Sequence, residues 1–165
     1  MTKKVILKGT YCLIIHLRVQ TAIEVGKKGT INFKEGYYIY VGSALNSLES
    51  RLKRHLSSDK KLFWHVDYLL SSSNSEIDEI VFAVDNSKWE CNLASEISLD
   101  GIEIFGFGCS DCKCNSHLFH FEDREESINC CIKAFNAIKL EPKMLDDLGS
   151  LKKTSFRKIF EIVNK

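Results

Sequence analysis

The sequence predicts an α+β fold, a small antiparallel sheet flanked by helices. Residues 11–19 and 37–42 alternate in hydrophobicity with the two-residue period of β-strands. A turn signal between short β-prone runs predicts a hairpin inserted between these two strands, at about residues 21–34. A stripe of leucines at helical spacing predicts an amphipathic helix after the second strand: Leu45, Leu48, Leu52 and Leu56.

Three further elements are expected as apolar runs between polar or turn residues: a helix over residues 62–70, a strand over 79–84 and a strand over 102–107. Ser87 and Glu90 are three residues apart, the spacing of a capping box, and would begin another helix that continues to Ile97. Residues 106–121 form a cysteine-rich loop that ends in an apolar run.

The chain is expected to divide after residue 125. Residues 1–125 hold the predicted sheet and its helices, whereas residues 126–165 form a helical C-terminal extension. Apolar residues at helical spacing predict two helices in this extension, over 128–138 and 156–163, on either side of the only proline.

The composition is that of one compact soluble domain with an appendage. The chain has 165 residues, of which 44% are hydrophobic and 27% charged. We expect a cytoplasmic protein that does not enter a membrane, because there is no signal-peptide pattern and no apolar run near the roughly 18 residues of a membrane span. The seven cysteines are an odd number, which favours reduced thiols or metal ligands over a disulfide scaffold.

The net charge of +1 conceals a strong asymmetry along the chain. Residues 1–61 carry 12 Lys and Arg against 4 Asp and Glu, and residues 62–126 carry 3 against 14. Residues 127–165 carry 8 against 4. The basic part suits a polyanion such as nucleic acid, and the acidic part is either solvated or holds a cation. Charges that are distant in sequence also mix in a folded protein, so this pattern alone does not settle a partner.

Four motifs that could take part in catalysis follow one another along the chain. Gly9-Thr10-Tyr11 and Tyr40-Val41-Gly42 each combine a tyrosine and a glycine on a predicted strand. Arg51 and His55 are four residues apart on the next helix and therefore share one of its edges. Glu90 comes at the start of a later helix.

This order of motifs resembles the GIY-YIG nuclease superfamily. The chain is most similar to a largely archaeal family of unknown function assigned to that superfamily, DUF123. The similar stretches lie between residues 9 and 121: GYYIYVGSALNSLESRLKRHL, FWHVDYLL, ECNLA and GFGCSDCKCNSHLFHF. The resemblance implies a GIY-YIG-like sheet domain and a divalent-metal-dependent endonuclease that hydrolyses phosphodiester bonds, with DNA as the expected partner, in repair or processing.

The resemblance also implies a role for each motif residue. Glu90 would hold Mg²⁺ or Mn²⁺, which takes few protein ligands and keeps several waters. Arg51 would clamp the phosphate with its planar donors. Tyr40 would orient the attacking water and accept its proton, and Tyr11 and His55 would complete the proton relay.

Three further polar side chains on the same strand and helix are expected to bind the nucleic acid: Ser43, Lys53 and Arg54. The chain departs from the superfamily pattern in three ways. Ser43 stands where the repair nucleases usually have lysine, and Arg51 lies one residue later than in those enzymes. The separation between Tyr11 and Tyr40 is long, which we attribute to the inserted hairpin.

Each motif residue also has a structural interpretation. Tyrosine is a common strand residue, and Arg51 and His55 suit a solvated or ion-paired helix edge. Glu90 fits the capping box with Ser87. The alternative function is therefore a non-catalytic nucleic-acid-binding or adaptor module on the same scaffold, with or without a stabilising zinc ion.

Two other groups of polar side chains could have a function, and one of them could bind a metal ion. The segment Cys109-x-x-Cys112-x-Cys114-x-x-His117 offers four ligands for tetrahedral Zn²⁺, although Cys112 and Cys114 are closer together than in most zinc knuckles. The alternative is a packed loop with thiols that act as small hydrophobic groups. His65 and Asp67 diverge by about 200° on a helix, so one would face the site and the other the core or solvent.

Overall fold

The computed structural model describes residues 6–145, and through them runs a six-stranded antiparallel sheet in the order β6-β7-β4-β1-β5-β8. Its strands, in chain order, are β1 (Gly9–Leu17), β4 (Gly36–Ala44), β5 (Ser75–Val84), β6 (Ile102–Glu103), β7 (Leu118–Phe121) and β8 (Lys143–Met144). β1 lies at the centre of the sheet, between β4 and β5. The predicted helix over 156–163 lies outside the described residues.

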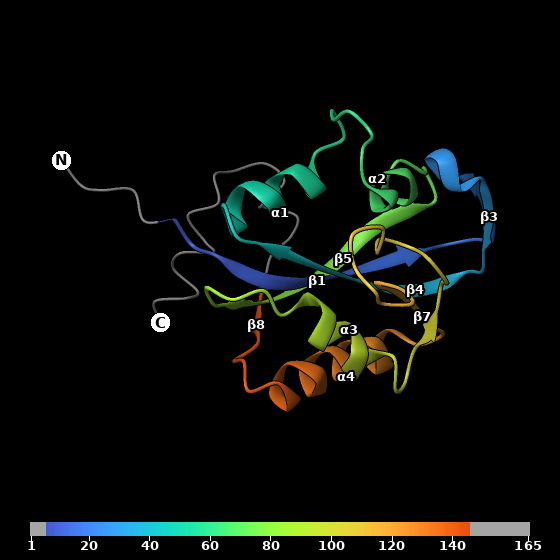
Figure 1. Ribbon diagram of the computed structural model, residues 1–165. Helices are drawn as coiled ribbons and strands as arrows, with labels where there is room; N and C mark the ends of the chain where they lie inside the picture. Colours follow the sequence, from blue (N-terminus) through green and yellow to red (C-terminus); the bar gives the residue numbers. More distant parts are fainter. Residues whose placement is uncertain (1–5, 146–165) are drawn as a thin grey trace.

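Four helices cover the two faces of this sheet in the part of the chain that is described. Their bounds are α1 (Leu48–Leu56), α2 (His65–Leu70), α3 (Glu90–Ile97) and α4 (Arg124–Ala137). α1 and α2 lie on one face, and α3 and α4 lie on the other (Figure 1). The α+β prediction is therefore confirmed. None of the described helices is long and apolar enough to cross a membrane.

The hairpin predicted between the two tyrosine strands is present. β2 (Thr21–Glu24) and β3 (Thr30–Phe33) pair with each other, apart from the main sheet, around a 3₁₀ turn over Gly26–Lys28. Val25 and Phe33 are fully buried and join the core beside α2. The insertion therefore packs on the domain without interrupting the pairing of β1 with β4.

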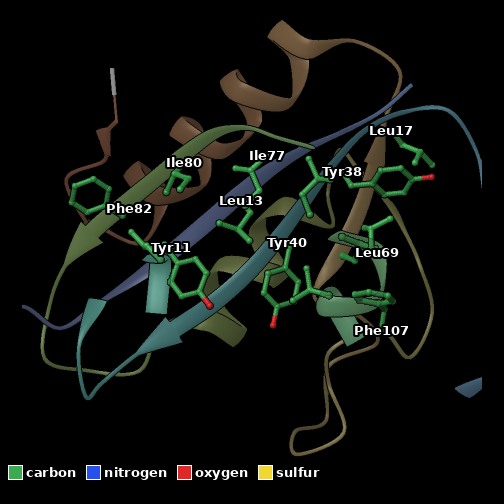
Figure 2. Packing of buried hydrophobic residues seen from close by; sticks show 14 of the residues in the cluster. Tyr11, Leu13, Leu17, Tyr38, Tyr40, Leu69, Ile77, Ile80, Phe82 and Phe107 are labelled. Atoms are coloured by element: carbon green, nitrogen blue, oxygen red, sulfur yellow. The ribbon is translucent and has the colours of Figure 1, made fainter. Parts of the chain in front are cut away.

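The alternation of β1 places its side chains in two separate layers. One layer packs against α1 and α2, and Figure 2 shows several of its members side by side: Tyr11, Leu13, Tyr38, Tyr40, Ile80 and Phe82. The other layer, with Cys12 and Ile14, packs against Leu93 and Ile97 of α3 and against α4. Each fully buried aliphatic or aromatic side chain contributes about 1.5–3 kcal/mol, so both layers stabilise the central strands.

The start of α3 differs from the sequence prediction. Glu90 is the first residue of the helix, and the N-cap residue, Trp89, makes no side-chain capping hydrogen bond. The Asp85 carboxylate instead accepts hydrogen bonds from the Ser87 backbone N–H and from the Trp89 indole, both at 2.8 Å. The capping-box prediction for Ser87 and Glu90 is wrong, because the Asp85 carboxylate accepts the hydrogen bonds that fix this turn.

The expected domain boundary at residue 126 falls inside a helix that packs on the sheet. α4 begins at Arg124, and its Asp123 side chain caps it by accepting from the Glu126 N–H at 3.1 Å. Cys131 and Phe135 of α4 are fully buried in the layer beneath the sheet. The first predicted helix of the extension therefore covers one face of the sheet in the described structure.

Candidate active site

The pairing of β1 with β4 brings the two motif tyrosines onto one face of the sheet. Tyr11 is paired with Gly42, and Leu13 is paired with Tyr40. Paired residues point to the same side of an antiparallel sheet, so the two rings are diagonal neighbours (Figure 2). A β-carbon at Gly42 would lie 2.5 Å from the Tyr11 hydroxyl oxygen. The glycine of the second motif is therefore needed to make room for the tyrosine of the first.

Beneath α1, Tyr11 forms a buried hydrogen bond with His55. The Tyr11 hydroxyl lies 2.6 Å from the His55 Nε2, and the two residues are 0% and 2% exposed. The Tyr40 and His55 rings are in T-shaped contact, with 6.0 Å between centroids. The His55 Nδ1 is buried and has no hydrogen-bond partner among residues 6–145. Three of the five predicted catalytic side chains therefore form one cluster.

Burial sets the protonation of this cluster. Desolvation, assisted by the positive charge of Lys60, lowers the pKa of His55 to about 3. Desolvation likewise raises the pKa of Tyr11 and of Tyr40 well above the usual value of a phenol. At neutral pH the imidazole and both phenols are therefore uncharged.

The neutral His55 makes the fold sensitive to acid. The unfolded chain protonates this histidine below its ordinary pKa of 6.5, whereas the folded protein resists protonation down to about 3. Stability is therefore complete above pH 6.5 and is lost as the pH falls toward 3. We expect His55 to lower the free energy of unfolding by about 3 kcal/mol between about pH 7.5 and 4.5. Urea unfolding across this range would measure the loss.

The control is His55→Gln, which has no titrating group but retains a hydrogen-bonding side chain for Tyr11. Its free energy of unfolding should fall less steeply with acidification than that of the wild type. Equal slopes for the two proteins would contradict a buried neutral His55.

Arg51 is held at the mouth of the site by two contacts. One guanidinium nitrogen donates to the Ser43 carbonyl at 3.0 Å, and the guanidinium lies 4.5 Å from the centroid of the Trp64 ring. The first turn of α1 is fixed by Ser47, whose hydroxyl accepts from the Ser50 N–H at 3.1 Å. Because a guanidinium has five N–H donors, these contacts leave donors for a ligand.

Arg54 is in a different environment, although it lies over the same Trp64 ring. Its guanidinium donates to both carboxylate oxygens of Asp67, at 2.9 and 2.8 Å, and its central carbon is 4.1 Å from the ring centroid. The Asp67 side chain is fully buried. Arg54 is thus held in a bidentate ion pair. Of the other residues expected to bind substrate, Lys53 is exposed away from the cleft and Ser43 lines it.

A cleft of about 480 Å³ is lined by side chains from three elements that carry the predicted catalytic residues. It receives Tyr40 from β4, Arg51 from α1 and Glu90 from α3. Tyr11 and His55 lie in the core behind Tyr40 and do not line it. The remaining polar and aromatic side chains of the lining are Ser43, Asn46, Phe63, Trp64, His65, Lys88, Ser110 and Asp111.

The carboxylates of the cleft suit a hard divalent cation. The Glu90 side chain is 14% exposed and pairs with Lys88, with 3.0 Å between Nζ and Oε1. Asp111 lines the same cleft from the cysteine-rich loop. Mg²⁺ is commonly bound by one or two carboxylates together with waters and substrate phosphates. A cleft of this volume has room for the waters and for a phosphate.

The sequence reasoning missed Lys88 and Asp111 as cleft residues. Lys88 supplies a positive charge in the cleft that Ser43 also lines. Its position two residues before Glu90 is the signal that could have indicated it. Asp111 was visible only as part of the cysteine motif, because nothing in the sequence shows that this loop reaches the cleft.

His65 links α2 to the cysteine-rich loop. Its Nδ1 accepts a hydrogen bond from the Gly108 backbone N–H at 2.9 Å, and its ring lies against Phe107. Gly108 has a φ of 71°, a left-handed conformation that favours glycine. Burial, with the positive charge of Lys28, lowers the pKa of His65, which keeps this nitrogen available as an acceptor. His65 therefore faces the cleft and anchors the loop, while Asp67 faces the core.

The cysteine motif is only partly gathered as the sequence suggested. Cys112, Cys114 and His117 come together, and the fourth member of their group is Cys91 of α3. Cys109 is not in the group; its carbonyl accepts from the Cys112 N–H at 3.3 Å, in the turn that directs the following residues inward. The expected ligand Cys109 is thus replaced by a cysteine far away in sequence.

Comparison with models of protein families yields a match. A family model described as domain of unknown function DUF123 matches residues 10–140, from β1 through the end of α4. No curated protein and no solved structure matches the chain.

Proposed function

The chain belongs to the family described as domain of unknown function DUF123, and from the geometry of its cleft we propose that it is a divalent-metal-dependent endonuclease that hydrolyses phosphodiester bonds in nucleic acid. The observation that carries this proposal is the convergence of Tyr40, Arg51 and Glu90 on one cleft from β4, α1 and α3. The buried Tyr11 and His55 behind them support a GIY-YIG-like assignment, because they are the remaining members of that motif set.

Arg51 and Lys88 are the side chains suited to the phosphate. Arg51 is fixed by Ser43 and Trp64 and retains planar donors that match phosphate oxygens in pairs. Lys88 adds a point charge to the same cleft. Glu90 and Asp111 supply the oxygens for the cation. Mg²⁺ or Mn²⁺ bound there would neutralise the charge that develops on the phosphate and the leaving oxygen.

Tyr40 is the residue placed to orient the attacking water and accept its proton. It lines the cleft, and its ring is supported from behind by Tyr11 and His55. Since burial raises the pKa of Tyr40, a phenolate requires the positive charge of Arg51 and of a bound cation, and Arg51 already opposes the shift. Tyr40 is therefore favoured as a proton acceptor only when a cation is bound in the cleft.

The rim of the cleft favours nucleic acid with unpaired bases. Phe63 lines the cleft and is 76% exposed, next to the Trp64 ring on which both arginines lie. Exposed aromatic rings bind unpaired bases by stacking, which contributes about 1–3 kcal/mol per base. Branched or single-stranded DNA is thus the preferred first substrate, with a role in repair or processing.

The test is cleavage of labelled single-stranded, branched and duplex DNA in Mg²⁺, in Mn²⁺ and in chelator. We expect metal-dependent cleavage that Glu90→Gln reduces about a hundredfold, because the substitution removes a charged ligand of the cation. Glu96→Gln, on the same helix but outside the lining of the cleft, is the matched control and should cleave as the wild type does. Cleavage that Glu90→Gln leaves unchanged would refute the enzyme.

The second candidate is a non-catalytic nucleic-acid-binding or adaptor module on the same scaffold. It is favoured by the raised pKa of Tyr40 and by the ion pair with Lys88 that already occupies Glu90. Binding that weakens steeply with salt, without cleavage in any divalent cation, would support this module. The absence of binding at low salt would exclude both functions.

A further inference from the structure

A second group of ligands lies beside the cleft, in the described part of the chain, and the cleft chemistry does not use it. Cys91 of α3 meets Cys112, Cys114 and His117 of the cysteine-rich loop, with their ligand atoms all within 4.8 Å of one another. All the cysteines of residues 6–145 are free thiols. We propose that these four side chains bind one structural zinc ion that fastens the loop to α3.

The distances fit tetrahedral zinc with little movement. The His117 Nε2 lies 3.8 Å from the Cys91 sulfur and 3.6 Å from the Cys112 sulfur. Zinc bonds of about 2.3 Å to sulfur and about 2.0 Å to nitrogen, at tetrahedral angles, place a nitrogen and a sulfur about 3.5 Å apart and two sulfurs about 3.8 Å apart. Because no two ligand atoms are more than 4.8 Å apart, the group needs contractions of about 1.3 Å at most to close around the ion.

The donor set selects zinc over the cation of the cleft. Three thiolates and one imidazole are soft or borderline ligands, whereas Mg²⁺ and Mn²⁺ prefer the oxygens offered by Glu90 and Asp111. Four protein ligands fill a tetrahedral site completely, which is typical of structural zinc and leaves no position for a substrate. The two sites would thus be separate in chemistry as well as in role.

The position of Cys91 also explains how a zinc site can form although the cysteines of the loop are unusually close together in sequence. Cys112 and Cys114 have a tighter spacing than most zinc knuckles, and a site made by the loop alone would require Cys109 as a ligand. With Cys91 as the fourth ligand, the ion joins two elements that are about twenty residues apart in sequence. A metal ion that closes such a loop stabilises the fold, because binding requires the folded arrangement of its ligands.

This cross-link lies directly against the proposed active site. Cys91 follows Glu90 in the first turn of α3, and the loop that carries the other ligands also presents Gly108 and Asp111 to the cleft. The zinc would therefore hold both carboxylates in position without contacting the substrate.

The experiment begins with the metal content of the full chain, purified under reducing conditions without chelator. Elemental analysis should find about one zinc per chain in the wild type, and a large loss in Cys91→Ser. Cys109→Ser is the matched control, because Cys109 is in the same loop but outside the group, and it should retain the metal. Loss of zinc from Cys109→Ser with retention in Cys91→Ser would overturn the proposal, as would a wild type that takes up no zinc on reconstitution.

A second measurement on the wild type does not depend on the folding of any variant. X-ray absorption at the zinc edge should give three sulfurs at about 2.3 Å and one nitrogen at about 2.0 Å. A shell of oxygen or of two sulfurs would refute the assignment. Neither measurement uses cleavage, so the zinc site stands or falls independently of the endonuclease.

Discussion

Replacing Arg51 with alanine is expected to lower the rate of phosphodiester cleavage about a thousandfold while the protein remains folded, the order of effect seen when an arginine that stabilises phosphoryl transfer is removed. The guanidinium is positioned by the Ser43 carbonyl and the Trp64 ring, and the ring keeps its contact with Arg54 when Arg51 is removed. Single-turnover cleavage of labelled DNA would measure the rate, and thermal unfolding would check the fold.

Two variants distinguish geometry from charge. Arg51→Lys keeps the positive charge but loses the planar pair of donors, so its rate should remain well below that of the wild type. Arg18→Ala removes an arginine that pairs with Glu76 away from the cleft, and it should cleave normally. A wild-type rate for Arg51→Ala would exclude this arginine from the reaction.

The fold was predictable from the sequence where one face of an element is buried. The alternation along β1 and the leucines of α1 report burial directly, because both layers of the core depend on them. The prediction failed at the start of α3, where the Ser87 backbone N–H donates to the Asp85 carboxylate and not to Glu90. Such a choice between two local hydrogen bonds depends on geometry that residue spacing does not contain.

The candidate site was predictable only where its residues share an element or a family motif. Arg51 and Arg54 are three residues apart on α1, and nothing local shows that one faces the cleft while the other meets Asp67. Likewise, Cys91 is invisible as a ligand until α3 is placed against the cysteine-rich loop. In both cases the missing information is a long-range contact.

Replacing Asp67 with alanine is expected to lower the free energy of unfolding by about 3–5 kcal/mol, because it leaves a partly buried charge without its partner. The carboxylate is fully buried and accepts hydrogen bonds from Arg54 and from the backbone N–H groups of Phe63 and Trp64, all between 2.8 and 2.9 Å. Burial alone would raise the pKa of Asp67, but these hydrogen bonds lower it, so the charged form is the one that stabilises the fold. Urea unfolding at neutral pH would measure the loss.

The control is Asp59→Ala, in the exposed segment after α1, which should change the free energy of unfolding by no more than about 0.5 kcal/mol. The comparison also decides between two roles for Arg54. If Asp67→Ala is as stable as the wild type, the ion pair does not hold α1 to α2, and Arg54 is free to bind the nucleic acid as first expected. If the variant is strongly destabilised, the proposed phosphate-binding role at the Trp64 ring falls to Arg51, because Arg51 lines the cleft and Arg54 does not.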